Sequence, residues 1–212
     1  IEAAWQRAIR LGHHEQLARS AAGLRSILMR GGLVRSAALL LRSAREQAVN
    51  TQQRADLLVA EAACLGRLGE GRQALDLLRG LSHDELPGAT RARLCAALAD
   101  AGLGLQSDAE QMRAGDEALA LAAAWLPAPE ACQVRCSILA QRARANLACP
   151  SLADAHALLL EARVAADPDV VSAALFVRGV VRFRWSPSRA ALNDLRAARR
   201  LQEQEGDESS LA

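Results

Sequence analysis

Residues 51–81 read TQQRADLLVAEAACLGRLGEGRQALDLLRGL, and this stretch predicts two short helices folded back on each other. Apolar residues recur at the spacing of one helical face, glycines interrupt the helix, and the apolar spacing then resumes. These residues are, in order, Leu58, Ala62 and Leu65, then Gly69 and Gly71, then Ala74, Leu78 and Leu81. A helix as short as the second is not stable alone in water, so the hairpin must pack against neighbours.

Similar hairpins precede and follow this one, so the sequence predicts an all-α array of about five helical hairpins, with around eleven helices and no sheet. The helices are expected over residues 1–11, 13–29, 33–49, the two halves of 51–81, 89–103, 108–126, 129–148, 152–166, 169–185 and 189–205. Small residues begin the apolar stripe of the second helices at intervals of about 36–40 residues, as repeats require. They are Ala37, Ala74, Ala114, Ala155 and Ala191. We expect a single repeat domain over residues 1–212.

The hairpins resemble the tetratricopeptide repeat, which places large and small residues at set positions of each helix. The matching residues are Leu58, Ala62, Leu65, Ala74 and Leu78 in the second hairpin, and Ala37, Leu41 and Ala44 in the first. Glu61 departs from the pattern, because an apolar residue is usual there, and Leu81 replaces a small residue. The resemblance implies a right-handed α-solenoid whose first helices line a concave binding groove.

Within that class, residues 36–81 and the following segment PGATRARLCAALADAG, residues 87–102, resemble the helical sensor segment of the large ATP-binding LuxR-family transcriptional regulators related to MalT. This resemblance implies an ATP-binding domain before the segment and a helix-turn-helix domain after it, and we expect the chain to be a piece of a larger protein. The chain contains no GxxxxGK[ST] loop, so ATP binding is not assigned to it. A peptide-binding adaptor or assembly scaffold is the alternative function.

Charge and hydropathy restrict the partners. The net charge is +2, which is too small for non-specific nucleic-acid binding by this segment. No apolar run reaches the length of about 18 residues that a membrane span needs. Five cysteines are an odd number for a disulfide framework, so we expect reduced thiols in a cytoplasmic protein. The partner is then a protein, a small-molecule effector or another domain of the same chain.

The sequence predicts no catalytic site, cofactor or metal site. Catalysis needs a base or nucleophile beside a partner, whereas surface positions explain all four histidines. These are His13, His14, His83 and His156. Cys132 and Cys136 share a helix face, but the usual zinc spacing is absent. The expected function is therefore binding without turnover.

The groove formed by the first helices is the candidate binding site. Its predicted lining comprises Arg19, Ser26, Asp56, Arg67, Arg144, Phe176, Arg178, Arg182 and Phe183. Arg178 and Arg182 are one helical turn apart, with Arg184 close by, and would suit a carboxylate or phosphate. The alternative interpretation is a solvated helix face whose arginine stems cover neighbouring residues.

Two further expectations concern packing. Trp5, Trp125 and Trp185 lie near helix ends, where an indole can be buried and still donate its N–H, so they are interpreted as wedges between hairpins. The alternative is a tryptophan that lines a ligand cavity. The apolar face of residues 1–11 has no preceding helix to cover it, and the last helix has no following one. We therefore expect weak end-to-end self-association.

Overall fold

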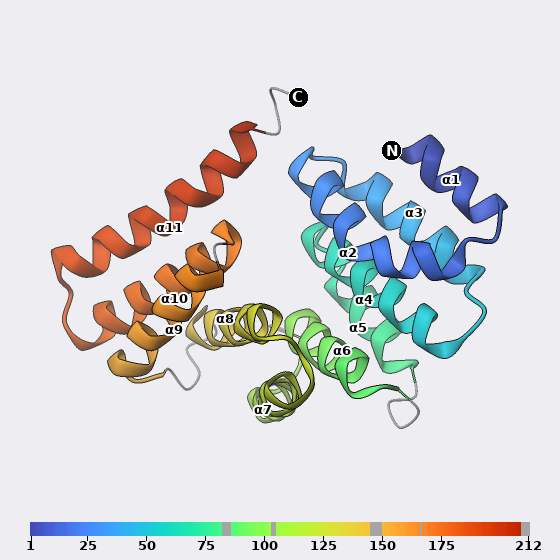
Figure 1. Cartoon of the computed structure of the whole chain (residues 1–212). Helices are drawn as coiled ribbons and strands as arrows, with labels where there is room; N and C mark the ends of the chain where they lie inside the picture. The colour runs from blue at the N-terminus through green and yellow to red at the C-terminus, as the bar shows by residue number, and fades with distance from the viewer. Residues whose placement is uncertain (82–85, 103–104, 145–149, 166, 209–212) are drawn as a thin grey trace. The chain divides into compact units, whose positions relative to one another are not determined.

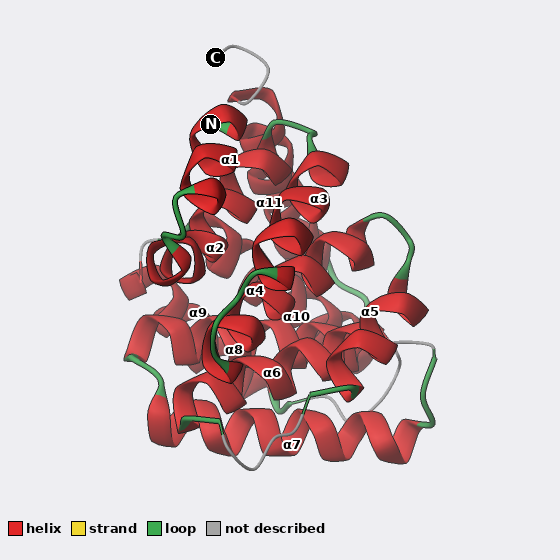
Figure 2. Ribbon diagram, turned by 90° about the vertical axis from the view of Figure 1, so that its right-hand side faces the viewer, coloured by secondary structure: helices red, strands yellow, loops and turns green. Residues whose placement is uncertain are grey.

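The computed structural model describes residues 1–81, 86–102, 105–144, 150–165 and 167–208, without the side chains of Ser26, Met29, Arg30, Arg144 and residues 204–208. Over these ranges the chain forms eleven α-helices and no strand (Figures 1 and 2). The helices are α1 (Glu2–Arg10), α2 (His14–Arg30), α3 (Val34–Glu46), α4 (Thr51–Arg67), α5 (Gly71–Arg79), α6 (Gly88–Ala101), α7 (Asp108–Trp125), α8 (Ala128–Arg144), α9 (Leu152–Ala165), α10 (Pro168–Trp185) and α11 (Arg189–Glu208). The predicted all-α class is confirmed.

The chain divides into two compact units, residues Ile1–Gln106 with α1–α6 and residues Ser107–Ala212 with α7–α11. The boundary falls inside the third predicted hairpin, between α6 and α7. The helices of the other four predicted hairpins pack against each other within one unit. The single domain over residues 1–212 stays a prediction.

Side-chain caps begin several helices where the sequence predicts a start. Ser151 accepts from the backbone N–H of Asp154 at 3.1 Å, and the Asp154 carboxylate accepts from the Ser151 backbone in return, so α9 begins with reciprocal caps. The Asp167 carboxylate accepts from the backbone N–H of Asp169 at 2.9 Å, with Pro168 in the first turn of α10. Such caps satisfy N–H groups that the first turn leaves unpaired.

A glycine follows the end of the helix that precedes each of three turns. Gly12, Gly32 and Gly69 have φ values of +71°, +70° and +79°. This left-handed conformation is strained for residues with a Cβ and open to glycine. The turns at these glycines therefore follow directly from the sequence.

In the first unit, α4 packs against α2, α3, α5 and α6, so it is the central helix (Figure 1). The residues that match the repeat pattern in the second hairpin are all buried together: Leu58, Ala62, Leu65, Ala74 and Leu78. Small side chains such as Ala37 and Ala55, both 0% exposed, let helix backbones approach closely. The core of this unit is therefore built largely of alanine and leucine.

The first helix does not leave its apolar face open. Trp5 and Ile9 of α1 are buried against α2 and α3, and the Trp5 indole donates to the backbone oxygen of Leu40 at 3.2 Å. The expectation that this face is uncovered is wrong, because Trp5 and Ile9 are buried where α1 packs against the two helices of the first complete hairpin. Self-association through this face therefore loses its basis.

In the second unit, α10 packs against α8, α9 and α11, and α8 also packs against α7 and α9. The core is again small and aliphatic, with Ala155, Leu158, Ala174 and Val177 all at 0% exposure. In both units the first helices of successive hairpins contact each other, as α2, α4 and α6 do, and as α8 and α10 do.

Two packing expectations are wrong. Trp125 is 61% exposed and Trp185 is 79% exposed, so neither is a wedge between hairpins. In the last helix, α11, Leu192 is 44% exposed. The buried stripe of α11 contains instead Ala191, Asp194 and Ala198.

Within the described ranges, no helix combines the length and the apolar character that a membrane span requires.

Two glycines provide a matched test of the turn geometry. Gly69→Ala places a Cβ at a positive φ and should lower the free energy of unfolding by about 1 kcal/mol. Gly23→Ala lies inside α2, with nothing within 4 Å of the added Cβ, and should raise it by about 0.5–1 kcal/mol. Urea denaturation followed by circular dichroism at 222 nm measures both. Shifts of the same sign would contradict the turn at Gly69.

Candidate functional site

The helices α10 and α11 approach closely because their facing residues are small. A Cβ placed on Gly179 would lie 2.8 Å from the Leu195 side chain, so only glycine fits there without a shift. The Ser172 hydroxyl donates to the backbone oxygen of Ala198 at 2.9 Å and is buried. This close contact holds the polar side chains of the two helices at hydrogen-bonding distance.

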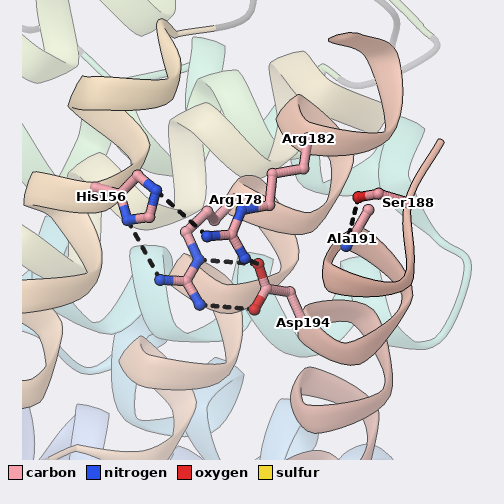
Figure 3. A network of polar contacts seen from close by, with 6 residues as sticks. All are labelled: His156, Arg178, Arg182, Ser188, Ala191 and Asp194. Carbon is pink, nitrogen blue, oxygen red and sulfur yellow. Dashed lines mark hydrogen bonds and ion pairs between the residues drawn. The ribbon is translucent and has the colours of Figure 1, made fainter. Parts of the chain in front are cut away.

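Asp194 of α11 is bound by two arginines of α10 (Figure 3). Arg178 donates from Nη2 to Oδ1 at 2.6 Å and from Nε to Oδ2 at 2.9 Å, which is a bidentate pair. Arg182 donates from Nη1 to Oδ2 at 2.8 Å. We call Arg178, Arg182 and Asp194 the Asp194 cluster.

His156 of α9 extends this cluster to a third helix. Arg178 Nη1 lies 3.4 Å from its Nδ1, and Arg182 Nη2 lies 3.3 Å from its Nε2 (Figure 3). The network therefore joins α9, α10 and α11, which are consecutive along the chain and which pack against one another pairwise around α10.

The interpretation of Arg178 and Arg182 as a solvated helix face is wrong. Their side chains are only 15% and 23% exposed, and the Asp194 side chain is 8% exposed. The sequence did indicate a partner of the right chemistry, a carboxylate, but the chain supplies that carboxylate itself. The arginine pair is thus first of all a connection between helices.

The predicted aromatic residues lie on the other side of α10. Because an α-helix turns by about 100° per residue, Phe176, Val180 and Phe183 share one face, opposite Arg178 and Arg182. Phe176 is half-buried and packs partly against the core, whereas Phe183 is 50% exposed. We call Phe176, Val180 and Phe183 the α10 apolar stripe.

The remaining predicted site residues do not gather at one place. Arg19 is exposed and pairs with Glu15 of its own helix, and Arg67 is exposed at the end of α4. Asp56 faces α6, where the Thr90 hydroxyl donates to it at 3.4 Å. The side chains of Ser26 and Arg144 lie outside the described residues.

A second cluster of the same design lies in the first unit. Glu61 of α4 is 0% exposed and accepts from Arg42 Nε at 3.1 Å and from Arg45 Nε at 2.7 Å, both in α3. We call these three residues the Glu61 cluster. Sequence reasoning missed the pairing, although Glu61 at an apolar position of the repeat was the signal for it.

The thiols are buried. Cys64, Cys95, Cys132 and Cys136 are free and buried, and Cys149 lies outside the described residues. Burial raises the pKa of the Cys64 thiol to about 11, with Arg25 opposing the rise, and burial also raises the pKa of Cys132 and Cys136. Such thiols are poor nucleophiles at neutral pH.

No metal centre is evident in the part of the chain that the structure describes, where no three His, Cys, Asp or Glu side chains gather closely enough to hold an ion. His83 lies outside that part. His156 is part of the polar network of α9, α10 and α11 described above.

Comparison with known proteins identifies no family for this chain: no protein-family model, no curated protein and no solved structure matches it significantly. The assignment of function therefore depends on the packing and the polar contacts described above.

The Asp194 cluster makes a stability prediction. Arg178→Ala with Arg182→Ala should lower the free energy of unfolding by about 3–5 kcal/mol, because it leaves a carboxylate that is 8% exposed without its cations. Adding Asp194→Leu should recover most of this loss, since the triple variant buries no unpaired charge. Urea denaturation measures both variants.

The control changes arginines of exposed ion pairs. Arg19→Ala and Arg199→Ala, at side-chain exposures of 78% and 80%, should each cost less than about 0.5 kcal/mol. A loss in the Arg178 and Arg182 variant as small as in these controls would contradict the buried connection between α10 and α11.

The thiol environment makes a reactivity prediction. Alkylation of Cys64 by iodoacetamide at pH 8 should be at least about tenfold slower in the folded chain than in the urea-unfolded chain, because Cys64 is 0% exposed and burial raises its thiol pKa to about 11, so little of the reactive thiolate is present. The difference should disappear in urea, where the thiol loses its buried surroundings. Peptide mass spectrometry resolves the site, and equal rates in the folded and unfolded chain would contradict the burial effect.

Proposed function

We propose that this chain is a non-enzymatic binding segment: a right-handed α-solenoid of helical hairpins that receives a protein or small-molecule effector, as the sensor segment of a LuxR-family transcriptional regulator does. The observation that carries the proposal is the α10 apolar stripe. It is an apolar face on a first helix that its neighbours leave partly open, with Phe183 50% exposed.

The way the helices contact each other supports a solenoid. First helices pack on first helices, as α2, α4 and α6 do and as α8 and α10 do. In a solenoid of hairpins this arrangement creates a continuous row of first helices, whose outward face is available for a ligand. In this proposal the ligand-binding face of α10 is the α10 apolar stripe, which lies on the side of the helix away from the Asp194 cluster.

Aromatic side chains suit this role energetically. A large ring contributes much contact area while few rotatable bonds are immobilised, so exposed aromatics are frequent binding anchors. The chain has only five aromatic residues, three Trp and two Phe. That both phenylalanines lie on one face of α10 is therefore a concentrated signal.

The alternative is an adaptor or assembly scaffold that binds peptide segments in the same groove. The two functions differ in the domains that accompany the segment. A phosphate-binding loop encoded upstream and a helix-turn-helix encoded downstream in the same reading frame would support the regulator. A reading frame without either would overturn the regulator and favour the adaptor.

Site-specific photo-crosslinking tests the proposed binding face. Benzoylphenylalanine placed at Phe183 of the natural full-length protein should give a covalent adduct in living cells, and mass spectrometry then distinguishes a small-molecule effector from a peptide segment. The same probe at Leu192, an equally apolar position at 44% exposure on α11, serves as the matched control.

An adduct at Phe183 and none at Leu192 is the expected result, because Phe183 extends a continuous apolar stripe. Equal labelling at the two positions, or no adduct at Phe183, would contradict the role of the α10 apolar stripe.

A further inference from the structure

The Glu61 cluster and the Asp194 cluster differ in how they use their remaining guanidinium N–H groups. In the Glu61 cluster, Arg42 Nη2 reaches the side-chain oxygen of Gln73 at 2.9 Å, in the amide orientation that satisfies both ends of that amide. A carboxamide oxygen is an acceptor at all pH values. This remaining donor of Arg42 is therefore satisfied within the unit.

In the Asp194 cluster, the remaining donors face an imidazole. Arg178 Nη1 lies 3.4 Å from Nδ1 of His156, and Arg182 Nη2 lies 3.3 Å from Nε2 (Figure 3). A neutral imidazole has one acceptor nitrogen and one N–H donor, and both arginines are donors only. At most one of these two contacts is a hydrogen bond, so the other sets two N–H groups against each other.

The tautomer that accepts from Arg178 at Nδ1 carries its proton on Nε2. The Nε2–H of His156 then faces the Nη2–H of Arg182 at a nitrogen–nitrogen distance of 3.3 Å, and two donors cannot pair with each other. Two arginines and one aspartate leave the cluster with a charge of +1, and Arg182 is the more exposed of the two arginines, at 23% against 15%. Convergent donors and positive charge are the features that bind an oxyanion.

We propose that Arg182 and His156 form a binding site for a small oxyanion, a carboxylate or a phosphate, one of whose oxygens accepts from Nη2–H of Arg182 and Nε2–H of His156. Asp194 stays in place, since it already uses both oxygens on the two arginines. The bound anion joins α9 to α10 from the side opposite the α10 apolar stripe. The site is therefore independent of the function proposed above.

The Glu61 cluster gives the matched control, because it has the same arginine pair and no histidine. The probes are inorganic phosphate and acetate, titrated separately into the full chain at constant ionic strength with chloride as the balancing anion. Long-range ¹⁵N–¹H NMR of the imidazole nitrogens reads His156 directly, and the thermal unfolding midpoint provides a second measurement. The two titrations distinguish a tetrahedral from a planar oxyanion.

The expected result is a saturable shift of the His156 nitrogens, with a rise in the unfolding midpoint, for at least one of the two anions. His156→Phe and Arg182→Leu should each weaken this binding at least about tenfold, since each removes a hydrogen bond to a charged group. Arg42→Leu, which removes the corresponding arginine of the Glu61 cluster, should leave the affinity unchanged.

Two results would overturn the proposal: no saturable shift with either anion, or a saturable rise of the midpoint that persists in His156→Phe. If Arg182→Leu does not fold, judged by its helical circular dichroism, His156→Phe decides alone, because that variant keeps both arginines on Asp194.

Discussion

Burial of a carboxylate between helices is the constraint on which much of this structure depends. A buried charge without a partner costs several kcal/mol, so each buried carboxylate requires cations at a defined distance and orientation. Glu61 and Asp194 both meet this requirement with two arginines of one adjacent helix. The consequence is that α3 is held in register with α4, and α10 with α11.

Aliphatic packing alone would not restrict the offset between these helix pairs as strongly as the ion pairs do. Alanine and leucine faces tolerate sliding, since many offsets bury similar apolar area, whereas a bidentate arginine pair tolerates few. Small residues let the helices come close enough for these ion pairs to form. Gly179 and Ser172 let α10 and α11 come close enough for the short contacts to Asp194.

The same arrangement divides the surface of α10 into two sides with different chemistry. One side places Arg178 and Arg182 between α9 and α11, and the other presents Phe176 and Phe183. Asp194 occupies both arginines on the first side, whereas Phe183 on the second side is 50% exposed. The two clusters also differ in what their remaining arginine N–H groups face. Arg42 donates to the side-chain oxygen of Gln73, whereas Arg178 and Arg182 both face His156, and a neutral imidazole has one acceptor nitrogen.

The sequence by itself determined the helical class, most of the helix ends and the buried residues of the repeat pattern. These features are local, since glycine, proline, capping side chains and the helical period act within a few residues. It did not determine which charged residues are buried. Two arginines one turn apart look the same in sequence whether they face water or a carboxylate.

Only the tertiary structure decided that Arg178 and Arg182 bind Asp194, 16 and 12 residues away, and that Glu61 is an ion-pair partner rather than an irregularity of the repeat. It likewise decided that Trp5 is covered while Trp185 is exposed. The physical reason is that the free energy of a polar or aromatic side chain depends on what the neighbouring helix presents. Which residues the neighbouring helix presents depends on packing between helices and not on the apolar period of either helix.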